Sequence, residues 1–143
     1  MSHHAFAAFD LGAESGRAML AVLRDGRIEL TEQHRFANTP QRLPSGLHWN
    51  LLELWRNLVE GLGRCVDAAK QRDVRLRSVG VDTWGVDCAL VGKSGQLLGL
   101  PFAYRDERHP PAMQWVFDKV GEKAIYDRTG IQFLPFNTLF QLC

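Results

Sequence analysis

One short polar segment, set between two apolar runs near the start of the chain, most constrains what this sequence can fold into. The run Ala5–Phe9 is followed by Asp10–Arg17, which reads Asp-Leu-Gly-Ala-Glu-Ser-Gly-Arg. A second apolar run follows and predicts a strand over Arg17–Arg24. Asp25-Gly26 is a strong hairpin signal before the alternating segment Arg27–Phe36. The chain is therefore expected to open with three antiparallel strands.

A long amphipathic helix is expected next. The segment Ala37–His48 contains two prolines and a glycine and is predicted to be a loop. Asn50 and Glu53 have the spacing of a capping box, and the helix is expected to end near Gln71. Two glycines in this helix indicate close packing on a sheet. The apolar positions expected to face that sheet are Leu51, Trp55, Leu58, Leu62, Cys65 and Ala69.

A second carboxylate ends the next predicted strand, Ser78–Asp82. Because ligands of open α/β sheets bind beyond the carboxyl ends of the strands, Asp10 and Asp82 are expected to lie at such a site. The strand order predicts an α/β protein with the ribonuclease-H-like fold of actin, Hsp70 chaperones and sugar kinases, a mixed sheet with flanking helices. The remaining expected elements are a strand pair at Cys88–Val91 and Gln96–Leu100, helices around Ala112–Val120 and Glu122–Arg128, and a short helix from the Asn137 cap.

The turn after the first strand has the groups needed to hold a metal-bound polyphosphate. Gly12 and Gly16 allow backbone N–H groups to approach phosphate oxygens, Ser15 adds a hydroxyl, and Asp10 can orient hydrated Mg²⁺. A nucleotide site is therefore predicted here. The alternative is a β-hairpin with an ordinary glycine-rich turn, since short glycine motifs recur often.

Composition narrows the possible partners. Among 143 residues there are 17 basic and 16 acidic ones, and a net charge of +1 supplies no broad field for nucleic acid or an anionic membrane. No apolar stretch approaches the roughly 20 residues that span a bilayer, and no signal-peptide pattern is present, so a cytoplasmic location is expected. The three widely spaced cysteines are expected to be reduced.

Four segments of the chain resemble the FGGY carbohydrate kinases, in the family's order and spacing and over almost the whole length. The second and fourth are distinctive rather than generic. The resemblance is strongest to members that phosphorylate the ketose L-rhamnulose. The segments are Asp10–Arg17, Gly80–Asp87, Gly99–Asp106 and Ile125–Leu139.

The resemblance implies ATP and Mg²⁺ as cofactors, a sugar as the other small-molecule partner, and a role for each matching residue. Glu14 departs from the small hydroxyl residue of some members, and its side chain is expected to point away from the triphosphate because like charges repel. The loop residues Arg105, Asp106 and Arg108 are further candidates for the sugar cleft. The implied sites are Gly12, Ala13, Glu14, Ser15, Gly16 and Arg17 for ATP, Trp84, Gly85 and Asp87 for the sugar, and Asp10 and Asp82 for the metal.

The resemblance also implies what is missing. Phosphoryl transfer needs a carboxylate base, and the family's catalytic aspartate lies downstream of the segments present here, beyond Cys143. The 143 residues are therefore expected to be the N-terminal lobe of a longer kinase and to have little activity alone. An apolar patch near the end is expected to cause self-association, and its residues are Phe133, Leu134, Phe136, Leu139, Phe140 and Leu142.

Two other functions remain open at this point. A metal-dependent nuclease of the same fold would use Asp10, Asp82 and an acid on the long helix, Glu53 or Glu60. A non-catalytic sugar- or nucleotide-binding module would use the same predicted phosphate turn and sugar loop to bind its ligand, without catalysing a reaction.

Overall fold

The computed structural model describes residues 4–143, which form two compact units. The first unit contains the described residues up to Thr39 together with Asn50–Trp84, and the second contains Pro40–Trp49 and Gly85–Cys143. No helix in this described part of the chain combines the length and the apolar character needed to cross a bilayer.

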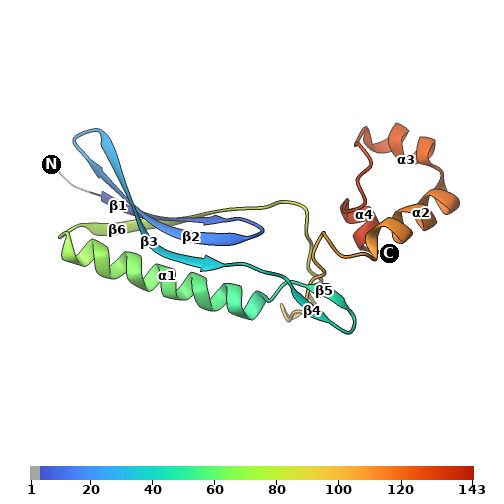
Figure 1. The fold of residues 1–143 in the computed structure, drawn as a ribbon. Helices are drawn as coiled ribbons and strands as arrows, with labels where there is room; N and C mark the ends of the chain where they lie inside the picture. The colour runs from blue at the N-terminus through green and yellow to red at the C-terminus, as the bar shows by residue number, and fades with distance from the viewer. Residues whose placement is uncertain (1–3) are drawn as a thin grey trace. The chain divides into compact units, whose positions relative to one another are not determined.

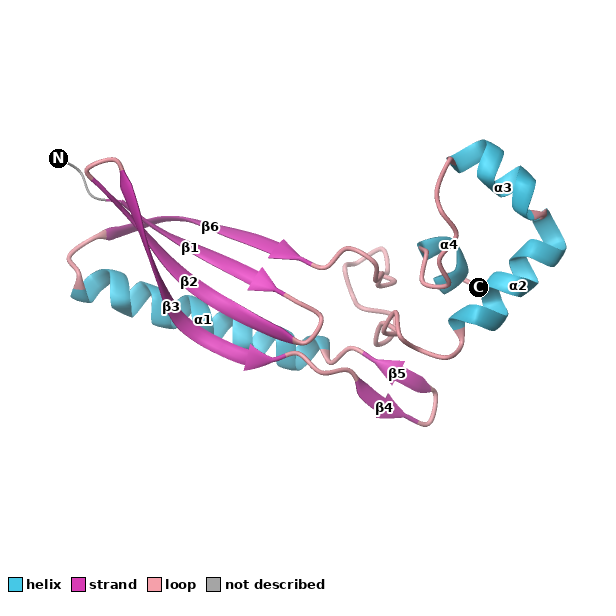
Figure 2. Cartoon of the chain, turned by 45° about the horizontal axis from the view of Figure 1, so that its top comes forward, coloured by secondary structure: helices cyan, strands magenta, loops and turns pink. Residues whose placement is uncertain are grey.

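A four-stranded mixed sheet forms the first unit (Figures 1 and 2). Its strands are β1 (His4–Leu11), β2 (Ser15–Arg24), β3 (Arg27–Ala37) and β6 (Arg75–Thr83), in the order β3-β2-β1-β6. The first three are antiparallel, as predicted, and β6 runs parallel to β1. Strand β2 begins two residues earlier than expected, because Ser15 and Gly16 already pair with β3.

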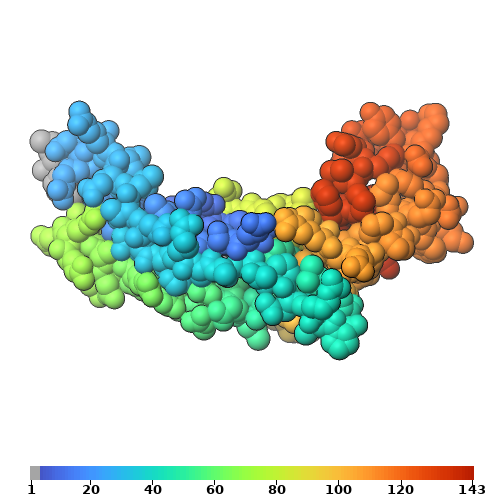
Figure 3. Space-filling view, in the orientation of Figure 1, coloured from blue at the N-terminus to red at the C-terminus, as the bar shows by residue number. Residues whose placement is uncertain are grey.

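Helix α1 (Leu51–Gln71) covers one face of this sheet, and its surface lies against the blue and cyan strands in Figure 3. The Asn50 side chain accepts a hydrogen bond from the Glu53 N–H at 3.1 Å, so the predicted cap is confirmed. The row that faces the sheet is Asn57, Gly61, Cys65 and Ala69.

Trp55 was predicted to face the sheet but is 66% exposed, and that prediction is wrong. The buried row of the helix passes through Asn57, two positions further on, so at about 100° per residue Trp55 lies on nearly the opposite side of the helix there. At Gly61, in the same row, a Cβ would stand 2.7 Å from the Ala18 Cβ. The helix approaches the sheet so closely that only small side chains fit along the central row, and the tryptophan lies outside it. Gly63 is exposed with nothing within 4 Å of a Cβ, so close packing explains only one of the two glycines.

The second unit begins with a short hairpin, β4 (Gln41–Leu43) and β5 (Gly46–His48), where a loop was predicted. The strand pair expected after it is present in short form, as a bridge between Val91 and Leu97 with backbone hydrogen bonds from Gly92 N–H to Gln96 O at 2.8 Å and from Leu98 N–H to Leu90 O at 2.9 Å. Three helices follow, α2 (His109–Val120), α3 (Glu122–Thr129) and α4 (Thr138–Gln141). Helix α2 starts before its predicted boundary because its two prolines fit the first turn.

The predicted C-terminal apolar patch is only partly exposed. Phe140 is 1% exposed and forms a small core with Val116 and Ile125. Leu139 and Leu142 remain exposed. Docking of α4 thus removes one of the three phenylalanines of the patch from solvent, and self-association through the remainder stays a prediction.

The two glycines of α1 give a matched pair of substitutions. Gly61→Ala should lower the free energy of unfolding by about 1–3 kcal/mol, because the added methyl group overlaps Ala18. Gly63→Ala should raise it by about 0.5–1 kcal/mol through helix propensity alone. Urea unfolding of both variants tests this, and equal effects of the same sign would contradict the close approach of helix and sheet.

Candidate functional site

A row of four charged residues crosses the sheet of the first unit, one residue from each strand. Asp10 of β1 pairs in register with Asp82 of β6 on one side and with Arg17 of β2 on the other. Arg17 pairs in turn with Arg35 of β3. Two carboxylates therefore stand next to two guanidinium groups, in the order Asp82, Asp10, Arg17, Arg35.

This charge row lies on the face of the sheet that α1 does not cover. Neighbours of Asp10 along β1, Phe9 and Leu11, are buried in the core beneath the helix, so the side chain between them points to the other face. Asp10 Oδ2 accepts hydrogen bonds from Arg17, from Nε at 3.1 Å and also from Nη2. Both side chains are about half exposed, at 49% and 42%. The pair is therefore accessible to a ligand.

Arg35 was not singled out from the sequence. Its Nη2 donates to Glu32 Oε2 at 2.6 Å, and this bond holds the pKa of Glu32 below its usual value. No local motif marks Arg35, which lies 18 positions after Arg17 in the chain (35 minus 17). Only the strand register brings the two guanidinium groups side by side.

The turn between β1 and β2 is shorter and more internally bonded than predicted. The Gly12 N–H donates to Ser15 O at 2.9 Å, and a Cβ on Gly12 would lie 3.1 Å from that same oxygen. Asn38 holds the turn from the end of β3, through its side chain to Gly12 O and its N–H to Glu14 O, both at 2.9 Å. The turn is thus fixed before any ligand binds, and Asn38 is a second residue missed in the sequence.

Gly16 has a packing role that does not involve a ligand. It is buried in β2, and a Cβ there would stand 2.2 Å from the Phe36 ring. Gly12 already uses its N–H within the turn, so in this structure that N–H is not open to a phosphate, whereas the predicted phosphate contact of Gly16 stays a prediction. The exposed Glu14, together with Ala13 and Ser15, remains the predicted contact surface.

Asp10 and Asp82 fit a magnesium ion bound partly by phosphate oxygens. Neighbouring strands lie about 4.8 Å apart, so two carboxylates in register can contact one hydrated ion. Mg²⁺ in nucleotide sites commonly takes one or two carboxylates plus substrate phosphates. The described residues contain no group of three or more metal-ligating side chains, which leaves this pair as the candidate.

The acids on α1 do not join this pair. Glu53 and Glu60 bind Arg56 and Arg64 on the exposed side of a helix that covers the opposite face of the sheet. The triad required by the nuclease alternative is therefore not assembled.

The predicted sugar loop begins where β6 ends. The Trp84 N–H donates to Leu11 O at 3.2 Å, and the half-buried indole packs against the core of the first unit. Gly85 is exposed, and a Cβ there would meet nothing within 4 Å. Asp87, in the second unit, accepts a hydrogen bond from the buried Trp49 indole N–H at 2.7 Å.

Asp106 supports the second unit and does not line an open cleft. It is 6% exposed and accepts hydrogen bonds from the Leu47 N–H at 2.5 Å and the Arg108 N–H at 3.0 Å. Burial opposes its ionisation, but these two donors hold its pKa below the usual value. Arg108 lies over the Phe102 ring, 4.0 Å from its centre.

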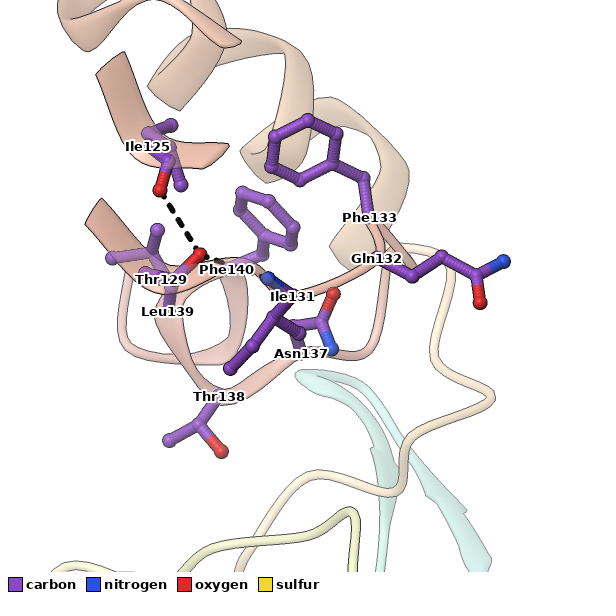
Figure 4. A pocket seen from close by; sticks show the side chains of 9 residues that line it. All are labelled: Ile125, Thr129, Ile131, Gln132, Phe133, Asn137, Thr138, Leu139 and Phe140. Carbon is purple, nitrogen blue, oxygen red and sulfur yellow. Dashed lines mark hydrogen bonds between the residues drawn. The ribbon is translucent and has the colours of Figure 1, made fainter. Parts of the chain in front are cut away.

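An apolar pocket of about 220 Å³ lies within the second unit beside α3 and α4 (Figure 4). Its wall includes Phe133 and Phe140, and Thr129 Oγ1 donates to Ile125 O at 2.9 Å across one side. None of the predicted ATP, sugar or metal residues lines it.

Comparison with known proteins decides the family. Residues 5–143 match the N-terminal domain of the FGGY family of carbohydrate kinases. The chain belongs to this family. It is 47% identical over 137 residues to a rhamnulokinase of Pectobacterium carotovorum, and 39% identical over 137 residues to one of Bacteroides thetaiotaomicron. These alignments cover 94% and 96% of the chain but only 27% of each relative, so the chain spans about a quarter of their length.

Solved structures of sugar kinases confirm the predicted fold. Plasmodium falciparum glycerol kinase with ADP superimposes with a TM-score of 0.81 at 15% identity, covering 99% of this chain and 28% of that one. Lactobacillus acidophilus gluconate kinase gives 0.78 at 14% identity, covering 99% and 28%. The chain thus has the actin- and Hsp70-like architecture expected from its strand order.

Asp106 provides a test of how the second unit is held together. Asp106→Asn places an amide N–H₂ where an oxygen now accepts a backbone N–H, and should cost about 1–3 kcal/mol of unfolding free energy at neutral pH. A carboxylate with a lowered folded-state pKa stabilises above its unfolded pKa, so the difference should shrink as pH falls below about 4.

The matched control is Glu107→Gln, because the neighbouring Glu107 side chain is 89% exposed. It should change the free energy of unfolding by less than about 0.5 kcal/mol. Denaturant unfolding between neutral and acidic pH provides the measurement. A pH-independent difference for Asp106→Asn would contradict the ionised, hydrogen-bonded carboxylate.

Proposed function

We propose that this chain supplies part of the active site of an ATP-dependent kinase that phosphorylates L-rhamnulose to L-rhamnulose 1-phosphate. The choice of sugar rests on similarity to relatives named rhamnulokinase, and the choice of reaction on the family. The single observation that carries the site is the charge row, in which the carboxylates of Asp10 and Asp82 adjoin the guanidinium groups of Arg17 and Arg35.

The carboxylates of the charge row suit the metal ion of MgATP, and its guanidinium groups suit the phosphates. Asp10 and Asp82 would hold Mg²⁺, which neutralises charge on the phosphoryl group during transfer. Arg17 donates to Asp10 from Nε and Nη2. Within the described part of the chain, this leaves Nη1 as the nitrogen that would donate to a phosphate oxygen. Until nucleotide binds, each member of the ion pair compensates the other.

The sugar would bind at the loop Trp84–Asp87. Gly85 leaves open space for a ligand to approach the backbone. The Trp84 indole would offer an apolar face to the sugar ring. Asp87, whose Oδ1 is buried and whose Oδ2 accepts the Trp49 indole N–H, would hold the loop that the sugar contacts. A catalytic base is not among these residues, because none of the acids present matches the family's base motif.

Turnover by the 143 residues alone is expected to be negligible, because alignment of the phosphates without a base leaves the sugar hydroxyl unactivated. The measurement is ADP release after L-rhamnulose, ATP and Mg²⁺ are added together. Release at rates of about 1–100 per second, typical of complete kinases, would refute the expected inactivity. Saturable binding of both ligands without turnover is the expected result, and absence of binding would contradict the proposed site.

Arg17 should contribute directly to nucleotide affinity. Arg17→Met should weaken MgATP binding by about tenfold or more, because a charge-assisted bond to phosphate is lost. Arg27→Met is the matched control, since Arg27 is an exposed cation at the opposite end of the same strand pair. Calorimetric titration should show that the control binds MgATP with an affinity within twofold of that of the unsubstituted chain. Equal losses of affinity in the two variants would indicate a general charge effect and contradict a direct contact of Arg17 with the nucleotide.

A further inference from the structure

A residue outside every predicted motif, Trp49, is fixed in place by the second unit. Its N–H donates to Pro101 O at 2.9 Å, and the preceding residue bridges Phe102. The Ala103 N–H donates to Leu47 O at 2.8 Å, so the end of β5 is held by a short antiparallel ladder. The Trp49 side chain is 2% exposed and therefore has little freedom to move.

The indole N–H of Trp49 forms a hydrogen bond with the predicted sugar loop. Trp49 Nε1 donates to Asp87 Oδ2 at 2.7 Å, a short bond from a neutral donor to a carboxylate. An indole has one N–H and no acceptor, so this bond fixes the direction of one carboxylate oxygen. One oxygen of the Asp87 carboxylate is thereby held in place before any ligand arrives.

Gln141 holds the same loop through its backbone. Its Nε2 donates to Val86 O at 2.5 Å and to Phe136 O at 2.8 Å, which uses both amide hydrogens. The Cys88 thiol donates to the Gln141 Oε1 at 3.7 Å. A buried amide from α4 thus binds the residues on either side of Asp87.

We infer that Trp49 and Gln141 are positioning residues for sugar recognition, which hold the Gly85–Cys88 loop in the conformation that receives a ketose, Trp49 through the Asp87 carboxylate and Gln141 through the Val86 carbonyl. This inference rests on the proposed function. Loop ordering on binding costs free energy for each immobilised group, and a loop held beforehand avoids that cost. Neither residue is placed to touch the reacting atoms, and each acts through the Gly85–Cys88 loop.

Titration of L-rhamnulose into the 143-residue chain tests the inference. Trp49→Phe removes the indole N–H, and should weaken ketose affinity about tenfold. Trp115→Phe, the same substitution at a 55% exposed tryptophan of α2, should change the affinity by less than twofold. Circular dichroism confirms that each variant is folded.

A double-mutant cycle separates positioning from general loosening of the fold. If Trp49 acts through Asp87, the double variant Trp49→Phe, Asp87→Asn should bind the ketose no more than twofold more weakly than Asp87→Asn alone. The inference would be overturned if the losses of ketose affinity in the two single variants were additive, or if Trp49→Phe bound the ketose within twofold of the unsubstituted chain. Either result would leave the proposed function intact. A chain that binds MgATP but no ketose at millimolar concentrations would overturn the inference and the proposed sugar site together.

Gln141→Leu tests the second contact independently, and remains informative if Trp49→Phe fails to fold. Amide hydrogen exchange at Val86–Cys88 should be faster than in the unsubstituted chain, with ketose affinity about tenfold weaker. Gln132→Leu is the matched control at an exposed glutamine of the same unit and should leave both unchanged. Unchanged exchange and affinity in Gln141→Leu would remove this residue from the inference.

Discussion

Parallel, in-register pairing of β1 with β6 is the constraint on which the candidate site depends. It places Asp82 directly beside Asp10, although 72 positions separate them in the chain (82 minus 10). A register shift of one residue would turn one of the two carboxylates to the other face of the sheet. The pairing does contain an irregularity, but it lies between Ala5 and Phe6, at the far end of β1. The carboxyl ends of the strands therefore remain aligned.

Close packing of α1 gives the sheet one covered face and one open face. Gly61 allows the helix to approach Ala18 and Phe9, so the core on that side is built from small side chains and a few large ones. The charge row consequently lies on the open face, where the Asp10–Arg17 ion pair is about half exposed. An exposed pair of this kind adds little to stability, so the proposed exchange of its partners for a metal and a phosphate would cost little free energy.

The second unit supports its loops with buried polar groups, because its apolar core is small. Asp106 and Gln141 bind backbone groups, and Trp49 binds the Asp87 side chain. Buried hydrogen bonds are costly to break one at a time, since the remaining partner loses its bond without regaining water. These contacts specify one loop conformation in a segment with little regular structure.

Much of the local structure was determined by the sequence itself. Alternation and the Asp25-Gly26 turn predicted the β-hairpin, the Asn50 cap predicted the start of α1, and the order of the expected strands and helix predicted the fold. These signals are local, since each depends on neighbouring residues and on preferences of the backbone. The FGGY motif also marked the turn after β1, but it did not reveal that Gly16 packs against the Phe36 ring and Gly12 against Ser15 O.

Only the tertiary structure decided which distant residues meet. Arg35 joins the charge row through strand register, Asn38 closes the β1–β2 turn from another strand, and Trp49 reaches Asp87 across 38 positions of chain. Trp55 faces solvent because the buried row of α1 runs through Asn57 and Gly61, a choice of face that the apolar pattern alone did not reveal. The physical reason is the same in each case: side-chain pattern records whether a residue is apolar or polar, whereas partners are set by the register and separation of packed elements.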